Sequence, residues 1–125
     1  MRALLIGFGV TNQAVAEALQ KRGHEFVVVD DKDFGGTPDV ATYERIIDEV
    51  DVVIPSPGVG DVHVALDLAR RAGVSVRSEF DLAAEWDSRP LLAITGTDGK
   101  TTVTTLTTNM LQASGVRAAD RKSVV

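Results

Sequence analysis

The chain has 125 residues, of which 44% are hydrophobic and none is cysteine, so it can form a sizeable core but neither disulfides nor thiolate metal sites. Its net charge is −5 and it carries no basic stripe, which argues against a general nucleic-acid-binding protein. No basic-then-apolar leader precedes the first apolar run, and no apolar run approaches the roughly 18 residues of a membrane span. The sequence therefore predicts a cytoplasmic protein without a membrane span.

Charged residues are distributed unevenly along the chain. Residues 1–88 hold 8 Lys and Arg against 16 Asp and Glu, whereas residues 89–125 hold 5 against 2. The change falls at Ser88-Arg89-Pro90, which is also a turn signal. We therefore expect two domains, residues 1–88 and residues 89–125.

The first predicted element is a strand over residues 2–7, where consecutive apolar residues lack helical spacing. The segment Gly7-Phe8-Gly9-Val10-Thr11-Asn12 follows and begins like the dinucleotide fingerprint G-x-G-x-x-G, with Asn12 at the third glycine position. A helix over residues 11–22 and a second strand over residues 26–29 would complete a βαβ unit.

Asp30 ends this second strand, about 20 positions after the glycines. A carboxylate at that place normally binds a ribose hydroxyl, so one interpretation of the unit is an NAD-linked oxidoreductase. The missing third glycine and a phosphate-binding loop further along the chain count against this interpretation. The simpler alternative is that Gly7 and Gly9 only permit a tight turn.

The alternation of helices and strands continues with a predicted helix over residues 40–50 and a third strand over residues 51–55. Ser56-Pro57-Gly58 follows, and prolines on both sides of the serine fix the backbone just beyond the carboxyl end of the strand. Open α/β sheets bind ligands at that edge, although an ordinary Pro-Gly turn explains the same residues.

A helix over residues 62–72, a strand over residues 74–76 and a helix beginning after Ser78 complete the first predicted domain. Ser78 is a typical N-cap and is followed by acidic residues that suit a first helical turn; a ligand-binding role for those acids is the alternative. The two histidines, His24 in a turn and His63 at a helix start, have no second metal ligand nearby and are predicted to lie at the surface.

A phosphate-binding loop is predicted near the start of the second domain. Residues 91–94 form an apolar run typical of a buried strand, and apolar residues at positions 103, 106, 110 and 111 share one helical face. The segment Gly96-Thr97-Asp98-Gly99-Lys100-Thr101-Thr102 joins them and ends at a helix N-terminus, which favours an anion. Lys100 adds a positive charge, and Thr101 a hydroxyl placed to reach phosphate-bound Mg²⁺. ATP is the predicted ligand.

The spacing of this loop is shorter than that of the general P-loop, because Gly96 lies only three places before Gly99. The form Gly-Thr-x-Gly-Lys-Thr resembles the ATP loop of the Mur ligases and of the related folylpolyglutamate synthases. The alternative is a glycine-rich turn with an incidental lysine.

The order of motifs along the chain resembles the D-glutamate-adding Mur ligases. These motifs are Gly-Phe-Gly-Val-Thr, Asp-x-Lys after the second strand, Ser-Pro-Gly-Val after the third, Ser-Glu-Phe-Asp-Leu after the fourth, and the loop. The resemblance covers about residues 1–118. It implies an α/β fold, in which a Rossmann-like UDP-binding domain with a mostly parallel sheet is followed by the first strand, P-loop and helix of a Mur-type ATPase domain.

The resemblance also implies roles for individual residues. In the first domain, the residues implied to bind the UDP substrate are Val10 and Thr11 near the diphosphate, Asp30 and Lys32 at the uracil, and Ser56, Pro57 and Gly58. In the second domain, the residues implied to bind ATP are Gly96, Thr97, Asp98, Gly99, Lys100, Thr101 and Thr102. Lys100, the one implied catalytic residue, would hold the β- and γ-phosphates, and Thr101 would ligate the metal.

The implied reaction is the ATP- and Mg²⁺-dependent addition of D-glutamate to UDP-N-acetylmuramoyl-L-alanine through an acyl phosphate, in peptidoglycan synthesis. The resemblance implies a monomeric cytoplasmic enzyme that binds no nucleic acid. The chain departs from the family at Asp98, where the family has Asn and where a negative charge should weaken nucleotide binding, and at Asn12, where it has glycine.

The family continues past the loop helix with further ligands and a third domain, so the chain alone is predicted to be inactive. Two other interpretations stay open: a stand-alone nucleotide-binding module, such as a truncated paralogue, and an NAD-linked oxidoreductase fragment.

Overall fold

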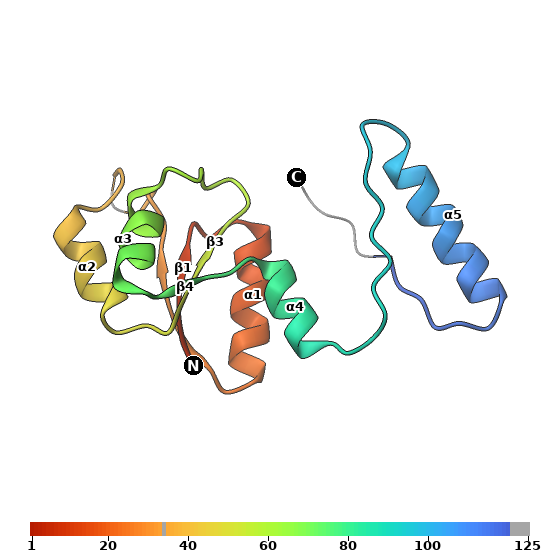
Figure 1. The fold of residues 1–125 in the computed structure, drawn as a ribbon, viewed down its shortest axis with the longest axis horizontal. Helices are drawn as coiled ribbons and strands as arrows, with labels where there is room; N and C mark the ends of the chain where they lie inside the picture. Colours follow the sequence, from red (N-terminus) through yellow and green to blue (C-terminus); the bar gives the residue numbers. More distant parts are fainter. Residues whose placement is uncertain (34, 121–125) are drawn as a thin grey trace. The chain divides into compact units, whose positions relative to one another are not determined.

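A computed structural model describes residues 1–33 and 35–120. The chain divides into two compact units, Met1–Ser88 and a second that begins at Arg89. The first holds a four-stranded, fully parallel sheet in the order β2-β1-β3-β4 (Figure 1). This arrangement confirms the predicted α/β class.

Strands and helices alternate through the first unit. The strands are β1 (Arg2–Ile6), β2 (Glu25–Val29), β3 (Val52–Pro55) and β4 (Ser75–Val76). The helices are α1 (Val10–Lys21), α2 (Val40–Ile47), α3 (Val64–Ala72) and α4 (Glu79–Trp86). Each predicted element of the first unit is therefore present, with ends that differ by up to three residues.

Helices cover both faces of the sheet, as Figure 1 shows. On one face, α2 and α3 place Tyr43, Ile47 and Leu66 against Leu4 and other strand residues. On the other face, α1 and α4 pack against the opposite side chains of the same strands. Because successive side chains of a strand point to opposite faces, β1 supplies both clusters and is apolar throughout its buried residues.

The N-terminus of α4 carries the cap that the sequence predicts. The Ser78 hydroxyl accepts a hydrogen bond from the Asp81 N–H at 3.2 Å, and the Asp81 carboxylate accepts one from the Ser78 N–H at 2.8 Å. This reciprocal capping box satisfies helix-end donors that would otherwise lack partners. At its other end, Trp86 stacks beside His24 and lies 4.3 Å from the Arg22 guanidinium, which joins α4 to the end of α1.

The second unit differs from the prediction at its first element. Residues 90–96 form no strand in the described part of the chain, and Leu91 and Leu92 are 83% and 65% exposed. A strand needs a neighbouring strand to pair its backbone groups, and the described residues of this unit contain none. The predicted buried strand is therefore wrong for this chain.

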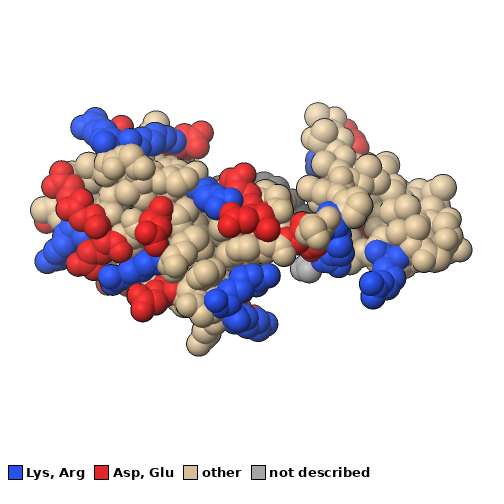
Figure 2. Space-filling view, turned by 60° about the horizontal axis from the view of Figure 1, so that its bottom comes forward, with Lys and Arg blue, Asp and Glu red and all other residues tan. Residues whose placement is uncertain are grey.

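Helix α5 (Lys100–Ala113) forms where the sequence predicts it, but none of its residues is buried. Val103, Leu106 and Met110 share its apolar face and are 49%, 56% and 70% exposed. Figure 2 shows few charged side chains on this unit, whereas charges of both signs cover the first. No described helix of either unit is long and apolar enough to cross a membrane.

Candidate functional site

The carboxyl ends of β1, β2 and β3 meet at one edge of the sheet. Parallel strands in the order β2-β1-β3 bring Gly7, Asp30 and Ser56 together, although they lie far apart in the sequence. Along the chain β1 is followed by β2 and then by β3, and in the sheet β2 and β3 lie on opposite sides of β1. This reversal of strand order is the place where open α/β sheets bind ligands.

The turn from β1 to α1 is held by Asp30. Its carboxylate accepts a hydrogen bond from the Phe8 N–H at 2.7 Å and another from the Lys32 N–H at 3.0 Å. The Lys32 and Phe8 N–H groups hold the pKa of Asp30 below its usual range, so the side chain is ionised at neutral pH. Asp30 therefore shapes the glycine-rich turn of the neighbouring strand.

The same turn approaches the loop after β3 closely. Gly7 has φ +74°, and a Cβ on it would lie 3.2 Å from the Ser56 Cβ. The Ser56 N–H donates to the Ile6 carbonyl at 2.8 Å, which draws the two chain segments together. Glycine is required here both for its backbone conformation and for the lack of a side chain.

Asn12 occupies the third glycine position and is completely buried. Its Nδ2 donates to the carbonyls of Ile6, Gly7 and Ile54, at 3.1, 2.8 and 3.3 Å. A side chain on α1 thus connects the carboxyl ends of β1 and β3. In the sequence, Asn12 was noted only as a departure from the third glycine of the fingerprint. The signal for its role is an amide side chain in the first turn of the helix that follows the first strand.

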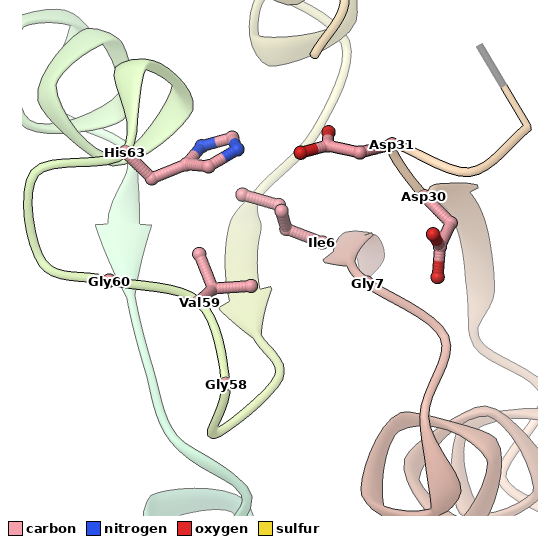
Figure 3. A pocket seen from close by; sticks show the side chains of 8 residues that line it. All are labelled: Ile6, Gly7, Asp30, Asp31, Gly58, Val59, Gly60 and His63. Carbon is pink, nitrogen blue, oxygen red and sulfur yellow. The ribbon is translucent and has the colours of Figure 1, made fainter. Parts of the chain in front are cut away.

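A cavity of about 260 Å³ lies at this edge and is shown in Figure 3. Residues from the ends of all three strands and from the start of α3 line it: Ile6, Gly7, Asp30, Asp31, Gly58, Val59, Gly60 and His63. Of the residues predicted to bind the UDP substrate, Asp30 and Gly58 line the cavity. The sequence reasoning missed Asp31, Val59, Gly60 and His63.

The other predicted residues of the first unit lie around this cavity without lining it. Ser56 contacts the turn at Gly7, while Pro57 and Lys32 are exposed. Val10 begins α1 and is 72% exposed, and Thr11 beside it is half-buried. The helix N-terminus that these two residues form has no side-chain cap, because its N-cap residue is Gly9.

Both histidines, predicted to lie at the surface, are partly exposed, but His63 also contacts the core. Its Nε2 is buried, and its ring packs edge-on against Tyr43 with 5.6 Å between ring centroids. The Nδ1 accepts a hydrogen bond from the Ala65 N–H at 3.2 Å, so His63 is the N-cap of α3. The sequence signal was its place just before an apolar helix, three residues after a glycine.

The predicted phosphate loop of the second unit ends at Gly99, the N-cap of α5, which has φ +74° and supplies no side chain to the helix end. No acidic residue follows in the first turn. The Lys100 ammonium folds back and donates to the Gly96 carbonyl. Lys100, Thr101 and Thr102 are exposed. A positive charge, two hydroxyls and the N–H groups at the start of α5 therefore lie together at the surface.

This loop fits the phosphates of a nucleotide. An uncapped N-terminus of a 14-residue helix, with a lysine at its first position, is suited to bind an anion. The loop also fits a Mg²⁺ ion that is bound mainly by phosphate oxygens, because Thr101 offers one hydroxyl ligand and Mg²⁺ retains waters and phosphates as its others. Thr97 and Asp98 are exposed in the same turn.

No family model matches the chain, but whole-protein comparisons find clear relatives. The chain is 39% identical to the UDP-N-acetylmuramoylalanine–D-glutamate ligase of Syntrophus aciditrophicus, over 91% of this chain and 28% of the relative. It is 38% identical to the ligase of the same name from Legionella pneumophila strain Paris, over 93% of this chain and 29% of the relative. A third, from Desulfosudis oleivorans, is 33% identical over 91% and 28%.

The chain therefore spans less than a third of the length of these relatives. The similarity covers both units, since it extends over more than nine-tenths of the chain. The resemblance to these ligases, which the sequence motifs predicted, is confirmed.

Proposed function

We propose that this chain is the UDP-substrate-binding part, and the beginning of the ATP-binding part, of a UDP-N-acetylmuramoylalanine–D-glutamate ligase. The observation that carries the proposal is the similarity to ligases of that name over nine-tenths of the chain. The geometry supports it, because a ligand-binding sheet edge lies in the first unit and an anion-binding loop in the second.

In this proposal, residues 1–88 form a domain that binds the UDP end of the substrate. Val10 and Thr11 lie at the uncapped start of α1, where N–H groups favour a diphosphate. Asp30 and Lys32 face the uracil, and the loop Ser56-Pro57-Gly58 forms the other wall. The close approach of Gly7 to Ser56 supports this assignment, because it fixes the distance between the two walls.

Residues 89–125 begin the domain that binds ATP. The segment Gly96–Thr102 would hold the phosphates, Lys100 would bind the β- and γ-phosphates, and Thr101 would offer a hydroxyl ligand to Mg²⁺. Bound Mg²⁺ neutralises charge on the phosphate oxygens. Lys100 is the proposed catalytic residue, because its ammonium stabilises the charge that develops on the transferred phosphoryl group.

The proposed reaction has two steps. The carboxylate of the alanyl group attacks the γ-phosphorus of ATP, which forms an acyl phosphate and releases ADP. The amine of D-glutamate then attacks the acyl carbon, which forms the amide bond and releases inorganic phosphate and a proton. Positioning and electrostatic stabilisation are the protein's contribution to the phosphoryl transfer.

The chain contains only part of the machinery for these steps. We expect the isolated chain to be inactive, and the complete protein to be a cytoplasmic monomer. The Asp98 carboxylate adds a negative charge beside the phosphates, so we expect Asp98→Asn to tighten ATP binding.

Calorimetric titration of the full chain with UDP-N-acetylmuramoyl-L-alanine, with ATP and Mg²⁺, and with NAD tests the proposal. We expect saturable binding of the first two ligands and none of NAD. Binding of NAD alone would contradict the proposal and favour an oxidoreductase fragment.

Two substitutions separate the proposed sites. Asp30→Ala should weaken binding of the UDP substrate at least 10-fold and leave ATP binding unchanged, because it releases the turn at Phe8. Lys100→Ala should do the reverse. Glu17→Ala, on the exposed side of α1, is the matched control and should change neither. Equal losses of both ligands in both variants would contradict two separate sites.

A further inference from the structure

Asp98 is followed by Gly99 in the loop before α5, and the sequence contains no other Asp-Gly pair and no Asn-Gly pair. Such a pair can rearrange without an enzyme, because the backbone nitrogen of the glycine lies within reach of the aspartate side chain and can attack its carboxyl group to form a succinimide ring. Glycine favours this attack, since it has no side chain to obstruct it and adopts many backbone conformations. In a folded chain, both reacting groups must also be accessible and without other partners.

The Asp98 carboxyl group meets this requirement. Asp98 is exposed, and its carboxylate forms no hydrogen bond and no ion pair with any residue in the described part of the chain. The Lys100 ammonium, two positions further along, donates to the Gly96 carbonyl instead. Asp81 differs, because its carboxylate is held by the Ser78 N–H at 2.8 Å. The Asp98 side chain is therefore free to turn toward the next peptide nitrogen.

The Gly99 nitrogen meets the same requirement. Gly99 is the N-cap of α5, so its carbonyl accepts a hydrogen bond from the Val103 N–H at 3.0 Å, whereas its own N–H donates to no group among the described residues. Gly99 is exposed, and no heavy atom outside its chain neighbours lies within 4 Å of the place where a Cβ would stand. Within residues 1–33 and 35–120, the attacking nitrogen is neither hydrogen-bonded nor covered.

The backbone before the helix allows the ring to close. Figure 1 shows the loop that leads into α5, and Thr97 and Asp98 lie in a bend of this loop. Their backbone groups form no backbone hydrogen bond with a described residue. Ring closure requires rotation of the backbone at Asp98, and this rotation breaks no hydrogen bond of a helix or a sheet.

We propose that Asp98 and Gly99 form a site of spontaneous isoaspartate formation, and that this modification disables the loop Gly96–Thr102. The modification itself does not depend on the proposed function. Its consequence does, because that part of the inference rests on the proposed binding of ATP by the loop.

The isomerisation has two steps, and water balances them. In the first step, the Gly99 nitrogen bonds to Cγ of the protonated Asp98 carboxyl group, the bond between Cγ and the hydroxyl breaks, and the hydroxyl leaves with the amide proton as water. In the second step, water hydrolyses the ring. Cleavage between the nitrogen and Cγ restores aspartate, whereas cleavage between the nitrogen and the backbone carbonyl carbon gives isoaspartate. No other reactant is needed.

Isoaspartate changes the path of the main chain at the loop. The chain then runs through Cβ and Cγ of residue 98, which inserts one additional carbon–carbon bond of about 1.5 Å before Gly99. The former backbone carbonyl becomes a free carboxylate. The N–H groups at the start of α5 and the Lys100 ammonium are displaced from Gly96, so they no longer converge on one phosphate group.

The test is incubation of the full chain for several weeks at neutral pH in H₂¹⁸O, followed by peptide mapping with mass spectrometry. Asp61 is the matched control within the chain. It is also exposed and without a partner among the described residues, but it precedes Val62, whose β-branched side chain obstructs attack by the backbone nitrogen.

Two variants complete the experiment. Asp98→Glu needs a six-membered ring, which closes less readily, and should give no detectable isomer. Asp98→Asn forms the same succinimide with loss of ammonia in place of water, so it is the positive control and should give more isoaspartate than the unaltered chain.

We expect isoaspartate at position 98 to accumulate at least about 10-fold faster than at position 61. Each isomerised molecule should carry ¹⁸O, because ring hydrolysis takes an oxygen atom from water. The melting temperature should stay within about 2 °C, since both buried clusters lie in the first unit.

The consequence for the loop is measured on the same sample. Chromatography separates the isoaspartyl form from the aspartyl form, and each is titrated with ATP and Mg²⁺. We expect the isoaspartyl form to bind ATP at least about 10-fold more weakly.

Equal rates of isomerisation at positions 61 and 98, or an isomer at position 98 without ¹⁸O, would overturn the proposed modification and leave the proposed function standing. Equal ATP affinity of the two separated forms would overturn its consequence for the loop. If the freshly purified chain binds no ATP while isoaspartate still forms at position 98, the modification stands and the proposed function of the second unit fails.

Discussion

Single polar side chains at the ends of strands determine the shape of the candidate site. Asn12 is the clearest case, because its amide contacts three carbonyls from two strands while its own Oδ1 is buried without a partner among the described residues. Such an arrangement holds the carboxyl ends of β1 and β3 together. Asn12 does not line the cavity itself but holds Gly7, which does.

Removal of the Asn12 amide should therefore be strongly destabilising. We predict that Asn12→Ala lowers the free energy of unfolding by about 2–3 kcal/mol, because buried carbonyls lose their donor. Urea unfolding followed by circular dichroism measures the effect. Gln13→Ala is the neighbouring control, whose side chain is exposed and bonds only the Phe8 carbonyl, and it should cost less than about 0.5 kcal/mol. Equal losses in the two variants would contradict the role of Asn12.

The acidic caps predict a specific pH dependence. The Ser78 N–H and hydroxyl hold the pKa of Asp81 below its usual range, so Asp81 binds its proton more weakly in the folded chain than in the unfolded chain. Its stabilising contribution is complete above the unfolded pKa of about 3.9 and is lost as the pH falls through the lower folded value. Asp81→Asn should thus destabilise the chain at pH 7, with a difference from the unaltered chain that shrinks below about pH 4.

Urea unfolding at a series of pH values, from about pH 2.5 to about pH 7, measures this difference. Asp67→Asn, whose carboxylate pairs only with Arg71 on the surface of α3, is the control. A difference between Asp81→Asn and the unaltered chain that grows toward acid would contradict the assignment.

At the scale of elements, the turns and helices of the first unit were largely predictable. Alternation of apolar runs and helical spacing located four strands and four helices, and Ser78 indicated the cap of α4. The cavity was only partly predictable: Asp30 and Gly58 follow strand ends, whereas His63 reaches the cavity through the turn of the chain after Gly60. The position of His63 before an apolar helix indicates an N-cap, but it does not indicate that the ring reaches the cavity. The failed strand at residues 91–94 has the same origin, because an apolar run becomes a strand only beside a partner.

Gly7, in the turn between β1 and α1, can be compared with Gly23, in the turn between α1 and β2. Gly7 and Gly23 have φ +74° and +71°, but only at Gly7 would an added Cβ meet a neighbour, the Ser56 Cβ, at 3.2 Å. We predict that Gly23→Ala costs about 1–2 kcal/mol from backbone strain alone. Gly7→Ala should cost more and should also weaken UDP binding, because it pushes the two walls apart.

Chemical denaturation and UDP titration of both variants measure these effects. Similar stability and similar UDP affinity for Gly7→Ala and Gly23→Ala would contradict a close approach that matters for the ligand.

At the scale of the whole molecule, the two units differ in how much buried core stabilises each of them. Every residue of the two buried clusters lies between Ala3 and Leu82, so the first unit contains both of its cores. The second unit presents apolar side chains to solvent along α5 and before the loop. Exposed apolar faces of this kind bury little area and contribute little stability.

We therefore predict that residues 1–88 alone fold and bind UDP as the full chain does. The melting temperature should differ by less than about 3 °C and the UDP affinity by less than about 2-fold, because neither core loses a residue. Circular dichroism and titration of both chains test this. A loss of cooperative melting in residues 1–88 would contradict the independence of the first unit.

The strand order of the sheet also constrains when the site can come into existence during synthesis. Arg2 of β1 pairs with Glu25 of β2, and Ala3 of β1 pairs with Val52 of β3. The first strand to be synthesised therefore lies between two strands that are synthesised later. The described sheet is parallel throughout and offers no hairpin as an early local nucleus, and each pairing closes a long loop, which slows folding. When the nascent chain has emerged from the ribosome only as far as the end of β2, the lining residues at the ends of β1 and β2 are present, but those that follow β3 are not. The cavity is complete only once Gly58 and His63, which line it, have also been synthesised.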